Sequence, residues 1–568
     1  MEYIVLLLTI FGIIALIMLK GLYDERRKQA NFVKWLRENY GVLREREEYK
    51  PEELEKISRY YLAHKTDGFQ IDDITWNDLG MDQVFEQMNH TYSAAGEEYL
   101  YYLLRTPAQD TVRMEKLESQ ICFFAQNSEK RVQYQTLFAQ IGKTGKYSIY
   151  DYLDYLEGLG ERSSGKHYLG DLAIAVSFLF MLFGSVQAGV ILLVAAISHN
   201  IIAYFKTKNE IDPYITSFGY ILRLLKNVGE MEKLPAAAFG QELEELGACC
   251  KKMGKFRSGS YILMSPARMG ASGNPLEILL DYMRMVFHLD LIKFNRMLAE
   301  VKKNSAFIDR MITLTGYMEA VIAIGCYRAS LETWCLPEFG EGKGLTLENG
   351  YHPLIGNPVK NSIMAKQGVL LTGSNASGKS TFLKTVALNA ILAQTIHTCL
   401  ADRYRAGIYR IMSSMTLRDD LAGGDSYYIV EIKSLKRILI HSADSGNPVL
   451  CFVDEVLRGT NTVERIAAST QILRSLAGRN VLCFAATHDI ELTHLLEDGY
   501  ANYHFEEEVE GDDVVFNYRL KKGRATTRNA IKLLGVMGYE EGIIREAERM
   551  AEQFLRTGNW GNGKGRLT

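Results

Sequence analysis

The chain has 568 residues, of which 47% are hydrophobic and 23% are charged, and its 65 lysines and arginines nearly balance 68 aspartates and glutamates. These proportions exclude collagen, a disordered tail and a small disulfide scaffold, and the length predicts about three or four domains. The formal net charge of -3 excludes a uniformly basic nucleic-acid binder but not a locally basic surface. The eight cysteines contain no C-x-x-C pair, so we expect free thiols in a reducing compartment and no zinc site.

The first apolar stretch, residues 3–19, has no formally charged side chain and reaches the lower end of the roughly 17–25 residues that span a bilayer as a helix. Basic residues follow it, whereas only Glu2 and the amino terminus precede it. A cleavable signal peptide would place the positive charges first. The positive-inside rule therefore predicts an uncleaved anchor whose amino terminus lies outside the cell and whose remaining chain is cytoplasmic.

A second apolar stretch, residues 172–205, contains no Asp, Glu, Lys or Arg. As one helix it would measure about 51 Å, against a hydrocarbon core of about 30 Å. Residues 184–189 fall near its middle and could turn the chain, which predicts a hairpin of two short membrane spans with both flanks cytoplasmic. The alternative is a buried helical hairpin in a soluble core. With the anchor, the first interpretation describes a multi-pass protein of the cell membrane.

The rest of the chain falls into a helical part and an α/β part. We expect an anchor at 1–22, a helical stalk at 23–69, an all-α core and lever at 70–168 and 207–340, an inserted membrane hairpin at 169–206, and an α/β domain at 341–568. In the last segment, β-rich runs at 368–372, 448–453 and 480–487 alternate with helices from Lys379 and at 463–476. This alternation predicts a doubly wound sheet, with a hairpin of residues 503–505 and 514–518 at its edge.

A complete G-x-x-x-x-G-K-S phosphate loop lies between the first predicted strand of this domain and its helix. Its glycines let backbone N–H groups turn toward phosphates, and the helix amino terminus adds its dipole. Lys379 is expected to reach the β- and γ-phosphates, and Ser380 to hold Mg²⁺. The predicted ATP contacts are Gly373, Ser374, Asn375, Ala376, Ser377, Gly378, Lys379, Ser380 and Thr381.

Two later strands are each followed by residues suited to hydrolysis. Asp454 and Glu455 follow the run at 448–453, which predicts Asp454 as a second Mg²⁺ ligand and Glu455 as the residue that polarises the attacking water. His488 follows the next strand and can sense the γ-phosphate through a hydrogen bond. We therefore predict an ATPase whose catalytic residues are Lys379, Glu455 and His488.

At these residues the chain resembles the DNA mismatch repair MutS family. The motifs that carry the resemblance are LTGSNASGKSTFL at 371–383, DDLAGGDS at 419–426 followed by Val430 and Glu431, LRGTNT at 457–462 and ATHDIELT at 486–493. Residues 351–354 resemble the family's entry strand, and residues 535–547 resemble its dimerising helices. The resemblance implies an ABC-type ATPase homodimer in which Asn375 approaches the phosphates and Ser426 touches the γ-phosphate of the partner subunit.

Three departures limit what the resemblance implies. No Phe-x-Glu wedge occurs in the first 300 residues, the mismatch-recognition and connector domains have no room before residue 70, and the hairpin interrupts the lever region. We therefore expect a membrane-anchored MutS-like ATPase without the mismatch-recognition domain.

DNA is the partner that the resemblance implies. Two short basic patches could contact its phosphates, Lys251, Lys252, Lys255 and Arg257 in one and Lys293, Arg296, Lys302 and Lys303 in the other. The alternative for both patches is the solvated surface of lever helices. We expect ATP-driven clamping of unusual DNA near the membrane; the alternative function is a membrane ATPase that acts on a membrane or protein partner without nucleic acid.

Overall fold

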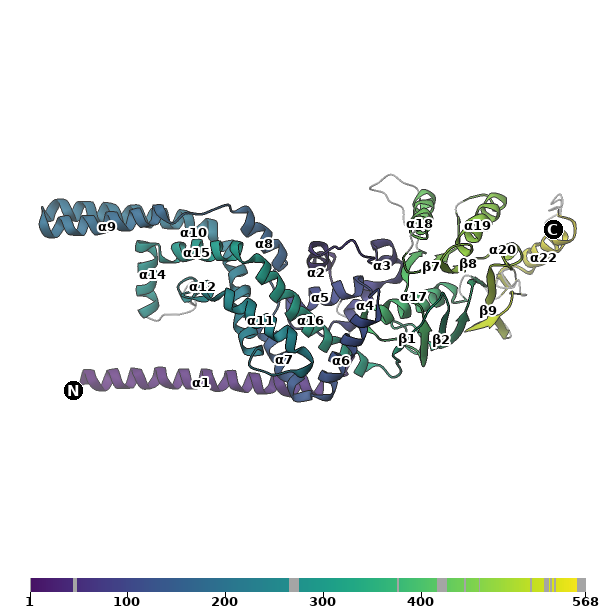
Figure 1. Ribbon diagram of the computed structural model, residues 1–568, viewed down its shortest axis with the longest axis horizontal. Helices are drawn as coiled ribbons and strands as arrows, with labels where there is room; N and C mark the ends of the chain where they lie inside the picture. Colours follow the sequence, from purple (N-terminus) through teal and green to yellow (C-terminus); the bar gives the residue numbers. More distant parts are fainter. Residues whose placement is uncertain are drawn as a thin grey trace. The chain divides into compact units, whose positions relative to one another are not determined.

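The chain passes several times between two structural units in the computed structural model (Figure 1). The helical unit contains Met1–Lys65, Gln87–Tyr102 and Glu118–Ser330, and the α/β unit contains Thr66–Glu86, Leu103–Leu117 and Leu331–Thr568. The structure describes residues 2–43, 48–264, 275–374, 377–415, 427–443, 446–458, 460–510, 513–525, 531, 534–535 and 538–558. The segment 70–168, which the sequence places in one helical part, is thus shared between the units.

The described part of the helical unit is built from helices. They are α1 (Glu2–Glu38), α2 (Pro51–Ala63), α5 (Ala94–Arg105), α6 (Thr111–Gln126), α7 (Ser128–Ile141), α8 (Ile149–Gly158), α9 (Gly165–Phe183), α10 (Val186–Met231), the 3₁₀ helix η1 (Ala237–Phe239), α11 (Gly240–Lys252), α12 (Gly254–Arg257), α13 (Tyr261–Met264), α14 (Pro275–Phe287), α15 (Leu289–Lys303) and α16 (Ser305–Ser330). Two of them run through predicted boundaries, since α1 joins the anchor to the stalk and α10 joins the hairpin to the second half of the core.

Helices α9 and α10 form the predicted hairpin, with a turn at Gly184 and Ser185 (Figure 1). They approach closely where side chains are small: a Cβ atom on Gly189 would lie 2.6 Å from the Cα atom of Met181. Gly170 likewise faces the amide of Asn200. Small residues and a buried amide at a helix–helix contact are typical of packing in lipid.

The outer surface of this hairpin is apolar and uncovered. Gly165–Phe183 and Val186–Ile211 are long and apolar enough to cross a membrane, and only 6% and 17% of their most apolar windows are buried. Phe183 and Ile191 are among the exposed large side chains. Among the described residues, the core therefore does not enclose the hairpin, contrary to the alternative of a buried hairpin in a soluble core.

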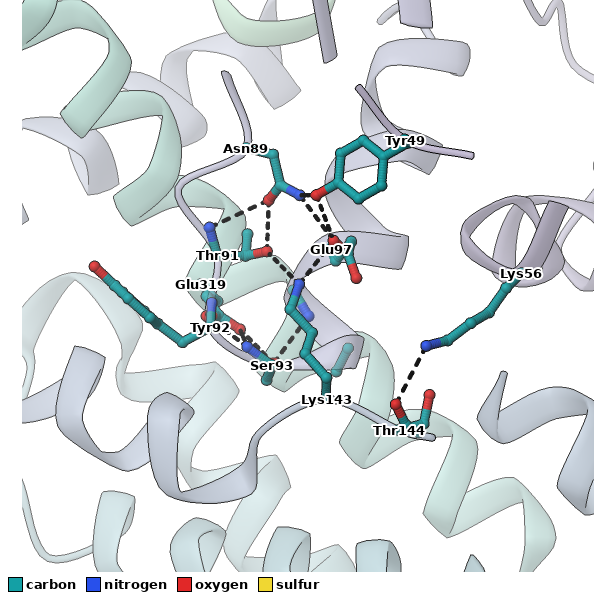
Figure 2. Close-up of polar contacts among 12 residues, drawn as sticks. Tyr49, Lys56, Asn89, Thr91, Tyr92, Ser93, Glu97, Lys143, Thr144 and Glu319 are labelled. Carbon is teal, nitrogen blue, oxygen red and sulfur yellow. Dashed lines mark hydrogen bonds and ion pairs between the residues drawn. The ribbon is translucent and has the colours of Figure 1, made fainter. Parts of the chain in front are cut away.

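A buried polar cluster ties α16 to the start of α5 (Figure 2). The carboxylate of Glu319, on α16, accepts hydrogen bonds from the backbone N–H groups of Tyr92 and Ser93 and from the Ser93 hydroxyl. Glu97 lies beside it and forms an ion pair with Lys143, with 2.8 Å between Oε1 and Nζ. These bonds satisfy backbone groups just before α5, which a helix cannot pair internally.

The α/β unit contains two sheets. The larger has the strand order β10-β9-β4-β8-β7-β6, parallel except for β10, and the smaller has the order β1-β5-β2-β3. The strands are β1 (Pro337–Phe339), β2 (Leu345–Gly350), β3 (Asn361–Ala365), β4 (Gly368–Thr372), β5 (Arg403–Ala406), β6 (Arg410–Ser414), β7 (Val449–Asp454), β8 (Val481–Ala486), β9 (Tyr500–Glu510) and β10 (Asp513–Lys522). The helices are α3 (Asp73–Leu79), α4 (Met81–Met88), α17 (Lys379–Ile396), α18 (Tyr427–His441), α19 (Thr462–Ala477), α20 (Ile490–Leu495) and α22 (Glu541–Thr557).

The predicted strands and helices of the parallel sheet are confirmed as β4, α17, β7, α19 and β8, each within about two residues. The edge hairpin is confirmed as β9 and β10, which run well beyond the predicted strands. Residues 351–354, predicted as an entry strand, are instead a loop after β2. Local apolar runs reveal buried parallel strands, whereas the smaller, mixed sheet depends on pairing between segments that are distant in the sequence.

The N-terminal segment of this unit covers the edge strand β6. Asp78, at the end of α3, accepts hydrogen bonds from the Ser413 hydroxyl at 2.7 Å and from the backbone N–H of Met415 at 2.9 Å. Thr75 accepts the backbone N–H of Ser413 at 3.1 Å. An uncovered edge strand offers unpaired backbone groups to other chains, so α3 protects this edge of the sheet.

Candidate nucleotide-hydrolysis site

The phosphate loop connects β4 to α17 through two glycines in conformations that other residues rarely adopt. Gly373 has a φ of 144° and Gly378 a φ of 101°. A Cβ atom on Gly373 would lie 2.8 Å from the carbonyl oxygen of Phe505, so this position also lacks room for a side chain. Both glycines are needed for the local geometry, because only glycine enters this region at no steric cost.

Lys379 begins α17 and points back into the loop. Its side chain is 3% exposed, and Nζ donates to the carbonyl oxygens of Gly373 at 2.9 Å and Ser374 at 2.7 Å. Nζ is also 3.4 Å from Nε2 of His488. A buried ammonium surrounded by backbone carbonyls and a histidine is held where it can meet an anionic ligand.

Ser380 and Asp454 lie together at the ends of α17 and β7. The Ser380 hydroxyl donates to Oδ2 of Asp454. Burial raises the pKa of the Asp454 carboxyl, and the hydrogen bond from Ser380 opposes this shift. A hydroxyl and a carboxylate side by side are the donor set with which Mg²⁺ of a Mg–ATP complex is bound.

Glu455 is placed between a histidine and an arginine. Its Oε1 lies 2.7 Å from Nε2 of His488, and its Oε2 lies 2.9 Å from Nε of Arg458. The hydrogen bond with His488 is the main cause that lowers the pKa of Glu455, and burial opposes it. The carboxylate is therefore ionised at neutral pH, as a residue that polarises water must be.

The loop that carries His488 is held by an ion pair that sequence reasoning missed. Arg465, on α19, donates to both carboxylate oxygens of Asp489, with N–O distances of 2.6 and 2.9 Å. A cavity of about 160 Å³ lies beside this pair and is lined by Glu455, Val456, Arg458, Arg465, Thr487, His488 and Asp489. No local sequence motif predicts this ion pair, because α19 and the segment after β8 come together only in the folded domain.

A larger cavity opens on the other side of the phosphate loop. Its volume is about 430 Å³, and its lining comes from the end of β2 and the loop after it, the start of β3, the first half of α17, and strands β9 and β10. Residues that line it include His352, Asn357, Gly378, Thr381, Phe505 and Tyr518. Tyr518 is another residue that sequence reasoning missed; a Cβ atom on Gly378 would lie 3.1 Å from its ring.

The structure brings the predicted site residues together from the ends of three neighbouring strands. Gly373, Ser374, Ser377, Gly378, Lys379, Ser380 and Thr381 follow β4, Asp454 and Glu455 end β7, and His488 follows β8. Asn375, Ala376 and Ser426 lie outside the described residues. Within the described ranges, no three His, Cys, Asp or Glu side chains form a group that could hold a metal ion.

Comparisons with known proteins agree with this geometry. Residues 369–555 match the family model of MutS domain V. The DNA mismatch repair protein MutS of Thermotoga petrophila is 30% identical over 287 residues, which cover 48% of this chain and 35% of that protein. That of Thermotoga maritima is 31% identical over 288 residues, or 48% of this chain and 34% of that protein. The matched part of this chain thus corresponds to about a third of the length of these curated relatives.

The domain match decides the activity class. MutS domain V is an ATPase domain, and the matched residues contain β4, the phosphate loop, Asp454, Glu455 and His488. Residues 369–555 are therefore a MutS domain V ATPase domain of α/β architecture, which is preceded in sequence by a large helical region.

Proposed function

We propose that this chain, whose residues 369–555 are a MutS domain V ATPase, works as a membrane-anchored homodimer that uses ATP hydrolysis to close its helical levers on unusual DNA structures. The observation that carries the proposal is the joint presence of this domain and the apolar hairpin in one chain. The relatives named above are DNA mismatch repair proteins, and that is the reason to propose DNA.

In the proposed reaction, the phosphate loop and Lys379 bind the β- and γ-phosphates of ATP. Ser380 and Asp454 would hold Mg²⁺, which would stabilise the negative charge of the phosphates. Glu455 orients and polarises the attacking water, and His488 reports the presence of the γ-phosphate through its contact with Glu455. Two further contacts are assigned from the family resemblance. Asn375 contacts the phosphates bound in its own subunit, and Ser426 contacts the γ-phosphate bound in the partner subunit.

The cavity lined by His352, Asn357 and Tyr518 is the proposed place of the nucleoside. It adjoins Gly378 and Thr381, so a nucleotide with its phosphates in the loop can extend into it. The aromatic ring of Tyr518 offers a stacking surface for a base.

The test of the hydrolytic mechanism is Glu455→Gln, which preserves the shape of the side chain but removes its charge. We expect steady-state hydrolysis to fall by about 100-fold or more, as is typical when a general base is lost. ATP binding, measured with the same protein in detergent, should be retained because the substituted position lies outside the phosphate loop. Hydrolysis at the wild-type rate would show that Glu455 is not the base.

DNA binding is proposed to involve the basic patch Lys251, Lys252, Lys255 and Arg257. All four side chains are exposed on α11 and α12, and of these Lys251 lies 3.7 Å from Glu232. In the second patch, the ammonium group of Lys302 already donates hydrogen bonds to the carbonyl oxygens of Glu157 and Gly160, so it is less available to a phosphate. The first patch is therefore the better candidate for phosphate contacts.

Titration of duplex, mismatched and branched DNA with the detergent-solubilised protein tests this proposal, with and without ATP. We expect nucleotide-dependent binding that weakens steeply with salt, because phosphate contacts release counterions. Charge reversal of the four-residue patch should weaken this binding. No binding at low salt would overturn the DNA assignment.

The second candidate function is a membrane ATPase that acts on a membrane or protein partner without nucleic acid. The specific observation in its favour is the exposed hairpin of α9 and α10, which belongs to the helical unit that the ATPase would move. For both candidates, we propose that residues 3–19 and 172–205 lie in the cell membrane and that the other parts are cytoplasmic. Extraction of a variant lacking residues 1–22 tests the hairpin, since it should stay in the membrane fraction at alkaline pH.

A further inference from the structure

We propose that Glu431 is a positioning residue for ATP hydrolysis, which holds the loop that carries Glu455. Glu431 lies on α18, and its Oε1 accepts the backbone N–H of Leu457, two residues after Glu455. Glu431 does not touch the nucleotide in this scheme but acts through Glu455, so the inference rests on the proposed role of Glu455 in hydrolysis.

The loop needs such support because of its backbone conformation. Glu455 has a φ of 56° and Leu457 a φ of 59°, and both are in the left-handed region without being glycine. Side chains with a Cβ atom disfavour this region, so two such residues so close together persist only when surrounding contacts hold them. A loop that relaxed from this conformation would turn the Glu455 carboxylate away from His488.

Contacts from three different elements hold the backbone of this loop. The N–H of Glu455 donates to the carbonyl of Ala486 in β8 at 2.9 Å. The carbonyl of Val456 accepts the hydroxyl of Ser469 in α19 at 3.1 Å. The N–H of Leu457 has the carboxylate of Glu431 as its acceptor. Glu431 thus supplies the contact at the end of the loop that lies beyond the catalytic residue.

The burial of Glu431 indicates that this contact is specific. The residue is 5% exposed, and its Oε2 atom has no hydrogen-bond partner among the described residues. Burial raises the pKa of Glu431, and the backbone N–H groups of Leu457 and Arg458 oppose this shift. Burying a carboxyl group costs free energy, and the hydrogen bonds that the group accepts offset this cost. The contact with the Leu457 N–H is therefore the interaction that justifies a carboxyl group at this position.

Helix α18 is a firm support for this side chain. Six residues beyond Glu431, Arg437 pairs with Asp72 at 2.5 Å and donates to the carbonyl of Ser413 in β6. Leu435 and Ile438 of the same helix are buried in the core of the sheet. Glu431 therefore reaches the loop from a helix that is fixed on its other side.

The test measures kcat and KM for ATP in the full chain in detergent. Glu431→Ala removes the acceptor, and we expect kcat to fall about 10- to 100-fold with KM changed less than about 3-fold, because a displaced catalytic group loses rate while the phosphate loop is untouched. Glu431→Gln keeps an acceptor oxygen and should hydrolyse within about 3-fold of wild type. Ser434→Ala is the matched control, since Ser434 is also buried on α18 and its hydroxyl has no partner among the described residues.

A double variant separates positioning from a general structural effect. If Glu431 acts through Glu455, then Glu431→Ala should add no further loss of rate to Glu455→Gln. A full additional loss in the double variant, or a wild-type kcat for Glu431→Ala, would overturn the inference. If the proposed role of Glu455 were wrong, the result would be distinguishable, because Glu455→Gln alone would then hydrolyse ATP at the wild-type rate.

A variant of similar volume covers the case in which Glu431→Ala does not fold. Glu431→Met fills the same space but cannot accept the Leu457 N–H, so it should show the same loss of kcat with ATP binding retained. Wild-type hydrolysis by Glu431→Met would overturn the positioning role as well.

Discussion

Arg465 forms a bidentate ion pair with both carboxylate oxygens of Asp489, and this pair holds the residue directly after His488 in place. His488 in turn lies 2.7 Å from Glu455, so Arg465 is linked through Asp489 to the two residues that we propose to act in hydrolysis. The planar fork of arginine matches a carboxylate in a way that the single ammonium of lysine cannot.

We therefore expect Arg465→Lys to lower kcat about 10-fold, although the charge is preserved. Arg474→Lys is the matched control, because Arg474 lies on the same helix and donates to a backbone carbonyl at the domain surface. Steady-state ATPase assays of both variants check the prediction. Equal rates for the two would mean that the bidentate geometry at Asp489 has no part in hydrolysis.

Tyr518 is expected to contribute to ATP affinity rather than to chemistry. Its ring lines the cavity beside Gly378, away from Glu455. Tyr518→Ala should raise the KM for ATP about 5- to 100-fold with kcat little changed, since base–aromatic stacking is worth about 1–3 kcal/mol. Tyr282→Ala, at an exposed tyrosine of α14, is the control. An unchanged KM in Tyr518→Ala would place the nucleoside elsewhere.

We predict that the stability of the helical unit depends on pH through the buried carboxyl group of Glu98. Burial raises its pKa to about 8, and the Ser148 hydroxyl donates to it at 2.9 Å. In the unfolded chain the same carboxyl titrates near 4.5, so the folded state binds the extra proton between these two values. The stabilising contribution is complete below about pH 4.5 and is lost as the pH rises toward 8.

Glu98→Gln should therefore melt at a higher temperature than wild type at pH 8, and the difference should shrink at pH 5. The glutamine resembles the protonated acid and can still accept the Ser148 hydroxyl. Thermal unfolding in detergent across this range tests the sign, with Glu157→Gln at an exposed site of α8 as the control. If Glu98→Gln is less stable than wild type at pH 8, the carboxyl is ionised in the folded protein.

Asp78 is expected to stabilise the α/β unit from outside the predicted ATPase segment. Asp78→Ala leaves the backbone N–H of Met415 and the hydroxyl of Ser413 without their acceptor, at a cost of about 1–3 kcal/mol for a buried donor. The urea midpoint for loss of ATPase activity should fall accordingly. Asp67→Ala, at an exposed position of the same segment, should leave it unchanged. Equal midpoints for both variants would show that α3 is dispensable for the sheet edge.

The local sequence pattern was enough to predict the strands β4, β7 and β8 and to predict that the candidate site residues follow them. The phosphate loop, the Asp454–Glu455 pair and His488 each follow a short apolar strand, and parallel strands bring their carboxyl ends to one edge of a sheet. The hairpin of α9 and α10 was equally readable, because a long run without charges is a property of neighbouring residues alone.

Only the tertiary structure revealed the contacts that join distant parts of the chain. Asp78 meets Met415 across 337 positions, Arg465 meets Asp489 between two elements, and Glu431 reaches Leu457 from a neighbouring helix. None of these partners is marked by periodicity or spacing, since each depends on how helices pack on the sheet. The sequence by itself determined which residues could do the chemistry and which segments are apolar, whereas packing decided which side chains hold them in place, because those interactions exist only after distant segments meet.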